Sequence, residues 1–139
     1  MIVDTNVLSS VFNKNIERQA IARDFLSRLG IIKTSVIVLY EIEYGLVRSG
    51  SMKSLASFKI LAQRSVRAYP VDEEIALLAA NMRAEQEAIG QTLHIEDLLI
   101  GATAKALGVP VATANEKDFA PWQIEIVNPF KDVAGKAKK

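Results

Sequence analysis

Carboxylates are the side chains with which this sequence could do chemistry. The chain of 139 residues contains no cysteine and a single histidine, His94. These counts exclude a Cys-His pair, catalysis by two histidines and a His-rich or thiolate zinc site within one chain. An enzyme with this sequence must therefore rely on Asp and Glu. The simplest way is to hold Mg²⁺ or Mn²⁺, which prefer oxygen ligands.

Asp4 is the first candidate, because it ends a short apolar run at the start of the chain. Thr5 and Asn6 follow it and are typical of a strand-to-helix turn. In open parallel sheets, ligands bind just beyond the carboxyl ends of the strands, where Asp4 would lie. An Asp before a helix is also a common N-cap, which binds exposed backbone N–H groups. Position alone favours neither interpretation.

Glu41 is the second candidate and lies within a strongly apolar helical segment. Burying a charge there is costly unless it is paired or bound to a metal. Gly45, one turn later on the same face, would leave open space beside the carboxylate, at a cost of about 1 kcal/mol relative to Ala. Alternatively, Glu41 forms an exposed ion pair with Arg48, or Glu43 is the inward residue. This segment alone favours the alternatives.

Asp97 lies near the start of another predicted helix, where the helix dipole favours an acidic residue in any case. Ile100, Gly101 and Ala104 share its side of the helix. Asp97 therefore heads the face that packs inward and should emerge at the sheet edge, with Glu96 as its solvated neighbour. This position favours a functional role modestly.

Thr113 and Asn115 follow an apolar strand, and Asp118 comes shortly after them. Polar residues at the carboxyl end of a strand would lie at the same sheet edge as Asp4. Asn115 and Asp118 are also common in ordinary turns and helix caps, which is the better interpretation of either residue in isolation. Trp122 and Tyr69 are expected in the core or in an interface.

Alternating strand-like and helix-like segments must position these residues. Strands are predicted for the opening apolar run that stops at Asp4, for Ile31–Thr34, for Val66–Val71 with a break at Pro70, for Val109–Thr113 and for Ile124–Val127. Helices are predicted around Ala22–Leu29, from Ser35 to Ser49, over Met52–Ser65, from Asp72 to Ile89 and over Ile95–Leu107. Right-handed crossovers then give a three-layer α/β/α sandwich with a central parallel sheet. We expect one domain over residues 1–130 and a loosely ordered basic tail over 131–139.

Charge is distributed unevenly although the net charge is only +1. Between residues 23 and 67 there are eight basic and three acidic residues, whereas residues 72 to 97 contain seven acidic residues and one arginine. Such asymmetry can indicate a nucleic-acid footprint beside an acidic centre, but solvated helix faces explain it equally well. No apolar run has the length of a membrane span and no signal peptide is visible, so we expect a cytoplasmic protein.

Four motifs, in order along nearly the whole chain, resemble those of PIN-domain ribonucleases, most of all the VapC and FitB-type toxins of toxin–antitoxin pairs. They are Ile2-Val3-Asp4-Thr5-Asn6-Val7-Leu8, the segment from Ser35 to Leu46, the segment from Glu96 to Ala104, and the segment from Val111 to Phe119. The resemblance implies a PIN-like fold and a Mg²⁺- or Mn²⁺-dependent endoribonuclease that cleaves RNA. It also implies a cognate antitoxin as inhibitor, and a homodimer.

By this resemblance, Asp4, Glu41 and Asp97 match the first three acidic residues of the family. The implied mechanism has Asp4 and Asp97 binding the metal, while Glu41 holds a second ion or the attacking water. Many members carry Asp where Asn115 stands, so either Asn115 or Asp118 could be the fourth member of the acidic set. The supporting polar positions are Thr5, Asn6, Thr113 and Asn115.

Two other functions remain open from the sequence. A phosphatase of the haloacid-dehalogenase type also begins with an Asp after a strand, but it needs a second Asp two residues later, where this chain has Asn6. The other is a degenerate domain that binds RNA or a partner without cleavage. If the carboxylates do cluster, repulsion should raise the pKa of one of them in the absence of metal. Possible phosphate contacts are Lys14, Arg48 and Lys53.

Overall fold

The computed structural model describes residues 1–131 and places parallel strands at the centre of the molecule. Strand β4 lies between β1 and β5, while β2 pairs with β3. The hydroxyl of Thr34 donates to the backbone carbonyl of Val3 at 2.6 Å and so joins the two groups of strands. Their bounds are β1 Ile2–Val3, β2 Ile32–Ser35, β3 Val66–Tyr69, β4 Val111–Ala112 and β5 Ile126–Val127.

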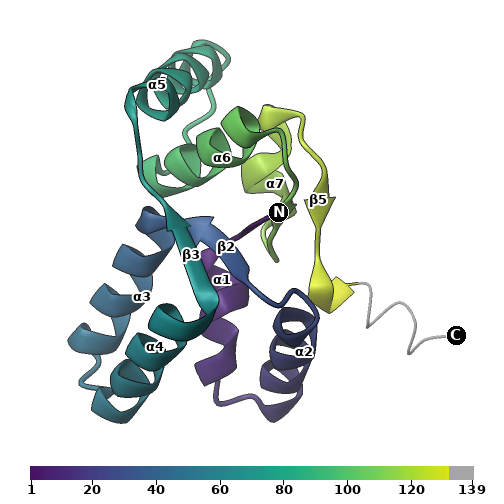
Figure 1. Ribbon diagram of the computed structural model, residues 1–139. Coiled ribbons are helices and arrows are strands. Elements are labelled where there is room, and N and C mark those ends of the chain that lie inside the picture. The colour runs from purple at the N-terminus through teal and green to yellow at the C-terminus, as the bar shows by residue number, and fades with distance from the viewer. Residues whose placement is uncertain (132–139) are drawn as a thin grey trace, which may run out of the picture.

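Helices cover the strands on both sides (Figure 1). On one side lie α1 (Thr5–Leu8), α2 (Ile16–Ser27), α3 (Val36–Arg48) and α4 (Met52–Ser65). On the other lie α5 (Glu73–Ala88), α6 (Ile95–Leu107) and α7 (Glu116–Phe119). Two short 3-10 helices, η1 (Ser9–Phe12) and η2 (Ala120–Trp122), continue α1 and α7. The predicted three-layer α/β/α sandwich with parallel strands is confirmed.

Local sequence explains where most of the helices begin and end. The side chain of Ser35 accepts from the N–H of Ile37 and begins α3, and Asp72 accepts from the N–H of Ile75 and begins α5. Gly108 ends α6 with a φ of +67°, a left-handed conformation that glycine adopts without strain. These three predicted boundaries are confirmed.

Other predicted boundaries shift. Helix α5 ends at Ala88, one residue before the predicted end at Ile89. The side chain of Ile89 is 69% exposed and does not join the core. Helix α2 begins at Ile16, well before the predicted apolar stripe, because the side chain of Asn15 accepts from the N–H of Arg18 and caps the helix there. Strand β3 stops before Pro70, and β4 begins after Pro110, since proline has no N–H to donate to a neighbouring strand.

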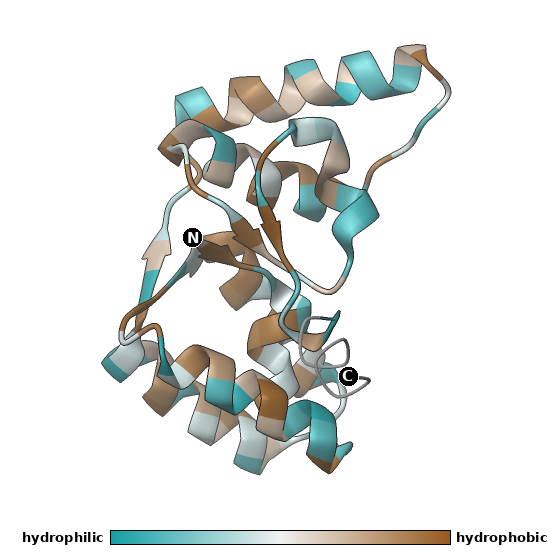
Figure 2. Ribbon diagram, turned by 90° about the vertical axis from the view of Figure 1, so that its right-hand side faces the viewer, coloured by the Kyte–Doolittle hydropathy of each residue, from teal (hydrophilic) through white to brown (hydrophobic). Residues whose placement is uncertain are grey.

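The core surrounds β1 and β4, whose residues are all fully buried. Figure 2 shows the hydrophobic residues of the central strands enclosed between the two helical layers. Trp122 is 3% exposed, which confirms its predicted core position, and its indole lies against Gly101 of α6. Within residues 1–131, no helix is both long and apolar enough to cross a membrane. Of the predicted tail over 131–139, only Lys131 belongs to the described residues, and its ammonium lies 3.4 Å from the carboxylate of Glu116. Residues 132–139 lie outside the described part of the chain.

Candidate active site

An acidic cleft lies at the carboxyl ends of β1 and β4, beside the first turn of α6 and the inner side of α3. Its volume is about 580 Å³. The residues that line it are Asp4, Thr5, Asn6, Ser9, Glu41, His94, Glu96, Asp97, Asn115 and Asp118. The structure therefore brings together the acidic residues selected from the sequence, although they come from four separate segments of the chain.

Asp4 lies at the floor of the cleft and is only 3% exposed. Its Oδ1 accepts a hydrogen bond from the backbone N–H of Thr5 at 2.7 Å, so Asp4 does cap α1. Its Oδ2 accepts from the Asn6 amide at 2.9 Å and from the Thr113 hydroxyl at 2.7 Å. Burial raises the pKa of Asp4, the bonds from Thr113 and Thr5 oppose that shift, and the charge of Glu41 adds to it. The two interpretations of Asp4 are thus compatible.

Asn6 and Thr113 form the bridge that fixes this carboxylate. The Asn6 amide nitrogen also donates to the Thr113 hydroxyl at 3.2 Å, while its carbonyl oxygen accepts from the N–H of Ala114 at 2.9 Å. The Thr113 hydroxyl accepts from the N–H of Asn115 at 3.0 Å and is fully buried. The bridge holds the ends of β1 and β4 in one arrangement around the cleft.

Glu41 points toward α1 and away from Arg48. The hydroxyl of Thr5 donates to its Oε1 at 2.6 Å, and among residues 1–131 no ion pair joins Glu41 to Arg48. Glu43 is the outward residue and lies 3.9 Å from the ammonium of Lys59. The alternatives that the α3 segment favoured are therefore wrong. The expected open space at Gly45 is confirmed, because a Cβ there would meet nothing within 4 Å.

Among the described residues that line the cleft, Asp97 has the most strongly shifted pKa. Its pKa is raised to about 7, first by burial and then by the charges of Asp4, Asp118 and Glu41, whereas the positive charge of His94 lowers it. The predicted rise in the pKa of one clustered carboxylate is confirmed, with burial as the larger cause and repulsion as the smaller. At neutral pH this side chain can exchange a proton readily.

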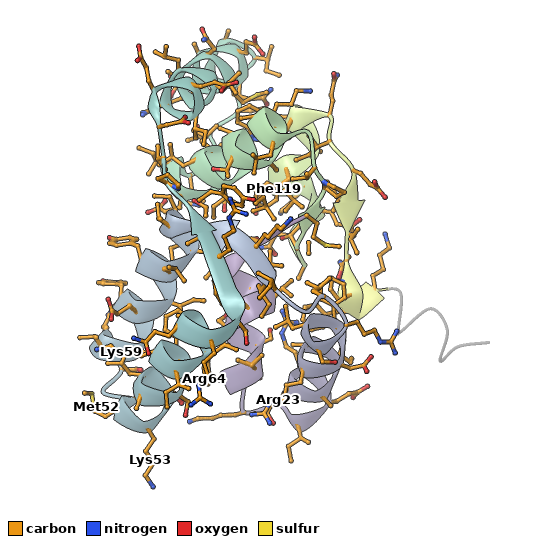
Figure 3. The ribbon with its side chains drawn as sticks, in the orientation of Figure 1. Arg23, Met52, Lys53, Lys59, Arg64 and Phe119 are labelled. Carbon is orange, nitrogen blue, oxygen red and sulfur yellow. The ribbon has the colours of Figure 1, made fainter. Side chains whose placement is uncertain are left out.

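Asp118 supplies the fourth negative charge, and Asn115 supplies an amide beside it. Both side chains line the cleft, but the charge of Asp118 acts on Asp97 more strongly than that of Glu41 does. Phe119, the next residue, is fully buried and lies beneath α6 (Figure 3). Asp118 and Asn115 thus both remain beside Asp97 in the cleft, and of the two only Asp118 is acidic.

Two lining residues, Ser9 and His94, had no role assigned from the sequence, while Glu96, expected as the solvated neighbour of Asp97, also lines the cleft. Ser9 lies one helical turn after Thr5, and His94 stands immediately before α6, so helical spacing from the candidate residues could have identified both. Conversely, none of the suggested phosphate contacts Lys14, Arg48 and Lys53 lines the cleft in the described part of the chain. Lys53 projects from the first turn of α4, away from the sheet (Figure 3).

The donor set suits a hard divalent cation. Carboxylate and amide oxygens line the cleft. Burial and mutual repulsion disfavour the negative charge of the carboxylates, which a bound cation would offset. Over residues 1–131, no three His, Cys, Asp or Glu side chains stand close enough to enclose an ion by themselves.

Comparisons with known proteins agree with this geometry. The PIN domain family model matches residues 1–121. A VapC ribonuclease from Sinorhizobium fredii is 26% identical over 137 residues, which cover 94% of this chain and 98% of that protein. The toxin FitB of Neisseria gonorrhoeae is 27% identical over 138 residues, with coverages of 95% and 99%. Among solved structures, the chain is similar to a VapBC2 structure from Rickettsia felis that is bound to a DNA fragment from its promoter. The TM-score is 0.74 at 25% identity, and the match covers 91% of this chain and 96% of that chain.

The phosphatase alternative finds no support in these comparisons or in the cleft. Its second Asp would have to replace Asn6, whose amide here bonds to Asp4, Thr113 and the N–H of Ala114. A carboxylate at this position could not donate to Asp4 and would add repulsion to a buried negative charge.

Proposed function

Because the chain belongs to the PIN-domain family, we propose that it is a metal-dependent endoribonuclease that acts as the toxin of a toxin–antitoxin pair. The observation that supports this most is the buried carboxylate of Asp4, held by Thr113 and Asn6 in one cleft with Glu41, Asp97 and Asp118. The names of the related VapC ribonuclease and FitB toxin supply the reaction and the biological role.

Asp4 and Asp97 are the residues that we propose to hold Mg²⁺ or Mn²⁺. When bound, the cation would lower the pKa of a coordinated water and stabilise negative charge on the phosphodiester. Thr5, Asn6 and Thr113 keep the carboxylates oriented, and such bonds to the ligands typically tune a metal site.

For Glu41 we propose that it orients the attacking water or holds a second ion. Its Oε1 is fixed by Thr5, and its other oxygen is free to accept a proton or a hydrogen bond. Asp118, at the rim, adds negative charge that makes bound metal more favourable. Asp97 must lose its proton before it can act as a ligand, which ties activity to pH near 7.

The partners follow from the same relatives. The FitAB and VapBC structures are complexes of a toxin with an antitoxin, and some contain DNA. We therefore expect a cognate antitoxin to bind and inhibit this chain, and we expect the chain to form a homodimer. We also expect the chain to act in the cytoplasm.

The test uses the protein purified free of antitoxin and incubated with structured RNA in Mg²⁺, in Mn²⁺ and in EDTA. Internal cleavage in either metal and none in EDTA is expected, and added antitoxin should suppress it. Cleavage that persists in EDTA would contradict the metal requirement. RNA binding without cleavage across many RNAs would instead favour the non-catalytic alternative, and release of phosphate from small phosphomonoesters would favour the phosphatase.

A further inference from the structure

The charge of the cleft is poorly matched to the substrate that the proposed nuclease would bind. Five carboxylates line it: Asp4, Glu41, Glu96, Asp97 and Asp118. Within the described residues 1–131, no lysine or arginine lines it. An RNA strand carries a negative charge at every phosphate, and contacts to those phosphates supply much of the affinity of RNA-binding proteins. The cleft therefore needs a group that attracts phosphate.

His94 is the one lining side chain in the described region that can carry positive charge. It occupies the N-cap position of α6, but its side chain makes no capping hydrogen bond to the helix. The residue is exposed, so its ring nitrogens remain available to a ligand. It is also close enough to the carboxylates that its charge acts on Asp97, three residues further along the chain.

Helix α6 brings His94 and Asp97 to the same rim of the cleft. Asp97 follows His94 by almost one helical turn, so the imidazole and the carboxylate leave the first turn of α6 on neighbouring positions. A phosphodiester held at Asp97 would therefore lie in the part of the cleft that His94 also lines. An imidazole N–H donates to phosphate oxygens as a charge-assisted hydrogen bond.

We infer that His94 is a substrate-binding residue that donates a hydrogen bond to a phosphate of the RNA strand entering the acidic cleft. This role depends on the proposed ribonuclease function, which it deepens by naming the residue that holds the RNA backbone. An ordinary exposed loop histidine, which would contact nothing, is the alternative.

The test measures binding of a fluorescent RNA oligonucleotide that the wild-type protein cleaves. All variants carry Asp4→Asn to prevent cleavage, and binding is measured by anisotropy in EDTA and in Mg²⁺. His94→Ala should weaken binding about tenfold in both conditions, since a charge-assisted bond of this kind contributes about that factor. His94→Asn keeps an N–H donor and should recover much of the loss. Gln91→Ala, an exposed residue of the same loop that does not line the cleft, is the matched control and should bind normally.

Two results would overturn the assignment. The first is a His94→Ala protein that binds RNA as tightly as its parent. The second is a Gln91→Ala protein that loses as much affinity as His94→Ala, because the loss would then come from the loop as a whole and not from the imidazole. Cleavage by proteins with an intact Asp4 separates the two proposals. If the wild type cleaves no RNA, the ribonuclease function fails, whereas cleavage with a raised KM and a nearly unchanged kcat in His94→Ala supports both.

Discussion

The hydroxyl of Thr113 donates to the Asp4 carboxylate at 2.7 Å, although 109 positions separate the two residues in the sequence. Both side chains are buried. Asp4 directly follows β1 and Thr113 directly follows β4, and these two strands pair in parallel. The bond opposes the effect of burial on the pKa of Asp4 and so favours its charged form. A carboxylate that must bind a cation is thereby kept both oriented and ionisable.

Replacing Thr113 by valine should test this relationship with little change in shape. The substitution removes the donor to Asp4 and the acceptor of the Asn6 amide, so the free energy of unfolding should fall by about 1–3 kcal/mol. RNA cleavage should fall by about 10- to 100-fold, as is typical when a residue that orients a metal ligand is lost. Chemical denaturation and initial cleavage rates measure the two effects.

Thr103→Val is the matched control for that variant. Thr103 is also fully buried, but its hydroxyl donates to the carbonyl of Leu99 within α6 and touches no carboxylate. Its loss should lower stability without a comparable loss of cleavage. If the two substitutions reduce cleavage equally at the same loss of stability, the claim that Thr113 supports activity by orienting Asp4 would be wrong.

Asp97 should make the metal-free protein less stable as the pH rises. Its folded-state pKa of about 7 lies above the unfolded value of 3.8, so the fold favours the protonated form, and stability is lost between about pH 4 and pH 7. Asp97→Asn removes this dependence and should gain roughly 2 kcal/mol relative to wild type at pH 8, because partial exposure reduces the full effect of the shift. Thermal unfolding of both proteins in EDTA at pH 5 and pH 8 measures the difference; a constant difference would contradict the shift.

The affinity for metal should depend on the protonation state of Asp97. Binding of Mn²⁺ requires ionised Asp97, so the affinity should increase from pH 6 to pH 8 and binding at pH 6 should release a proton. Calorimetry in two buffers of different ionisation enthalpy measures that release. Affinity that is independent of pH over this range would show that Asp97 is not a ligand.

Two helical glycines should respond oppositely to alanine. A Cβ at Gly101 would lie 2.1 Å from the indole nitrogen of the buried Trp122, whereas a Cβ at Gly45 would meet nothing within 4 Å. Gly101→Ala should therefore cost about 1–3 kcal/mol through overpacking, and Gly45→Ala should stabilise α3 by up to about 1 kcal/mol. Denaturant midpoints of the two variants measure these changes. Stabilisation by both substitutions would contradict the close packing of Trp122 against Gly101.

Most helices and strands, and the positions of Asp4 and Asp97, were predictable because local rules determine them. Strand ends place Asp4 and Thr113 at one edge of the sheet, and helical periodicity places Asp97 on the inward face of α6. Glu41 was not predictable from its own segment, because the residue that orients it, Thr5, lies 36 positions away. Helix α2 begins before its apolar stripe, and its first turns carry no periodic signal, since they face solvent.

The identity of the fourth acidic residue could not be resolved from the sequence either. Asn115 and Asp118 are both common in turns, and a choice between them requires the position of α7 relative to Asp97. Buried Phe119 sets that position through packing in three dimensions. His94 likewise gained a role only when its neighbours in the cleft were known.

The most direct measurement is the cleavage rate of one RNA substrate by wild type and by Asp4→Asn, under single-turnover conditions in saturating Mn²⁺. Asp4→Asn keeps the shape of the side chain but replaces one of two hydrogen-bonded acceptor oxygens by an NH₂ group, so thermal unfolding of the variant must show a folded protein at the assay temperature before the rates are compared. We predict a loss of at least about 100-fold in rate together with loss of Mn²⁺ binding. A folded Asp4→Asn protein that cleaves RNA at the wild-type rate would contradict the assignment of this cleft as the metal-dependent active site.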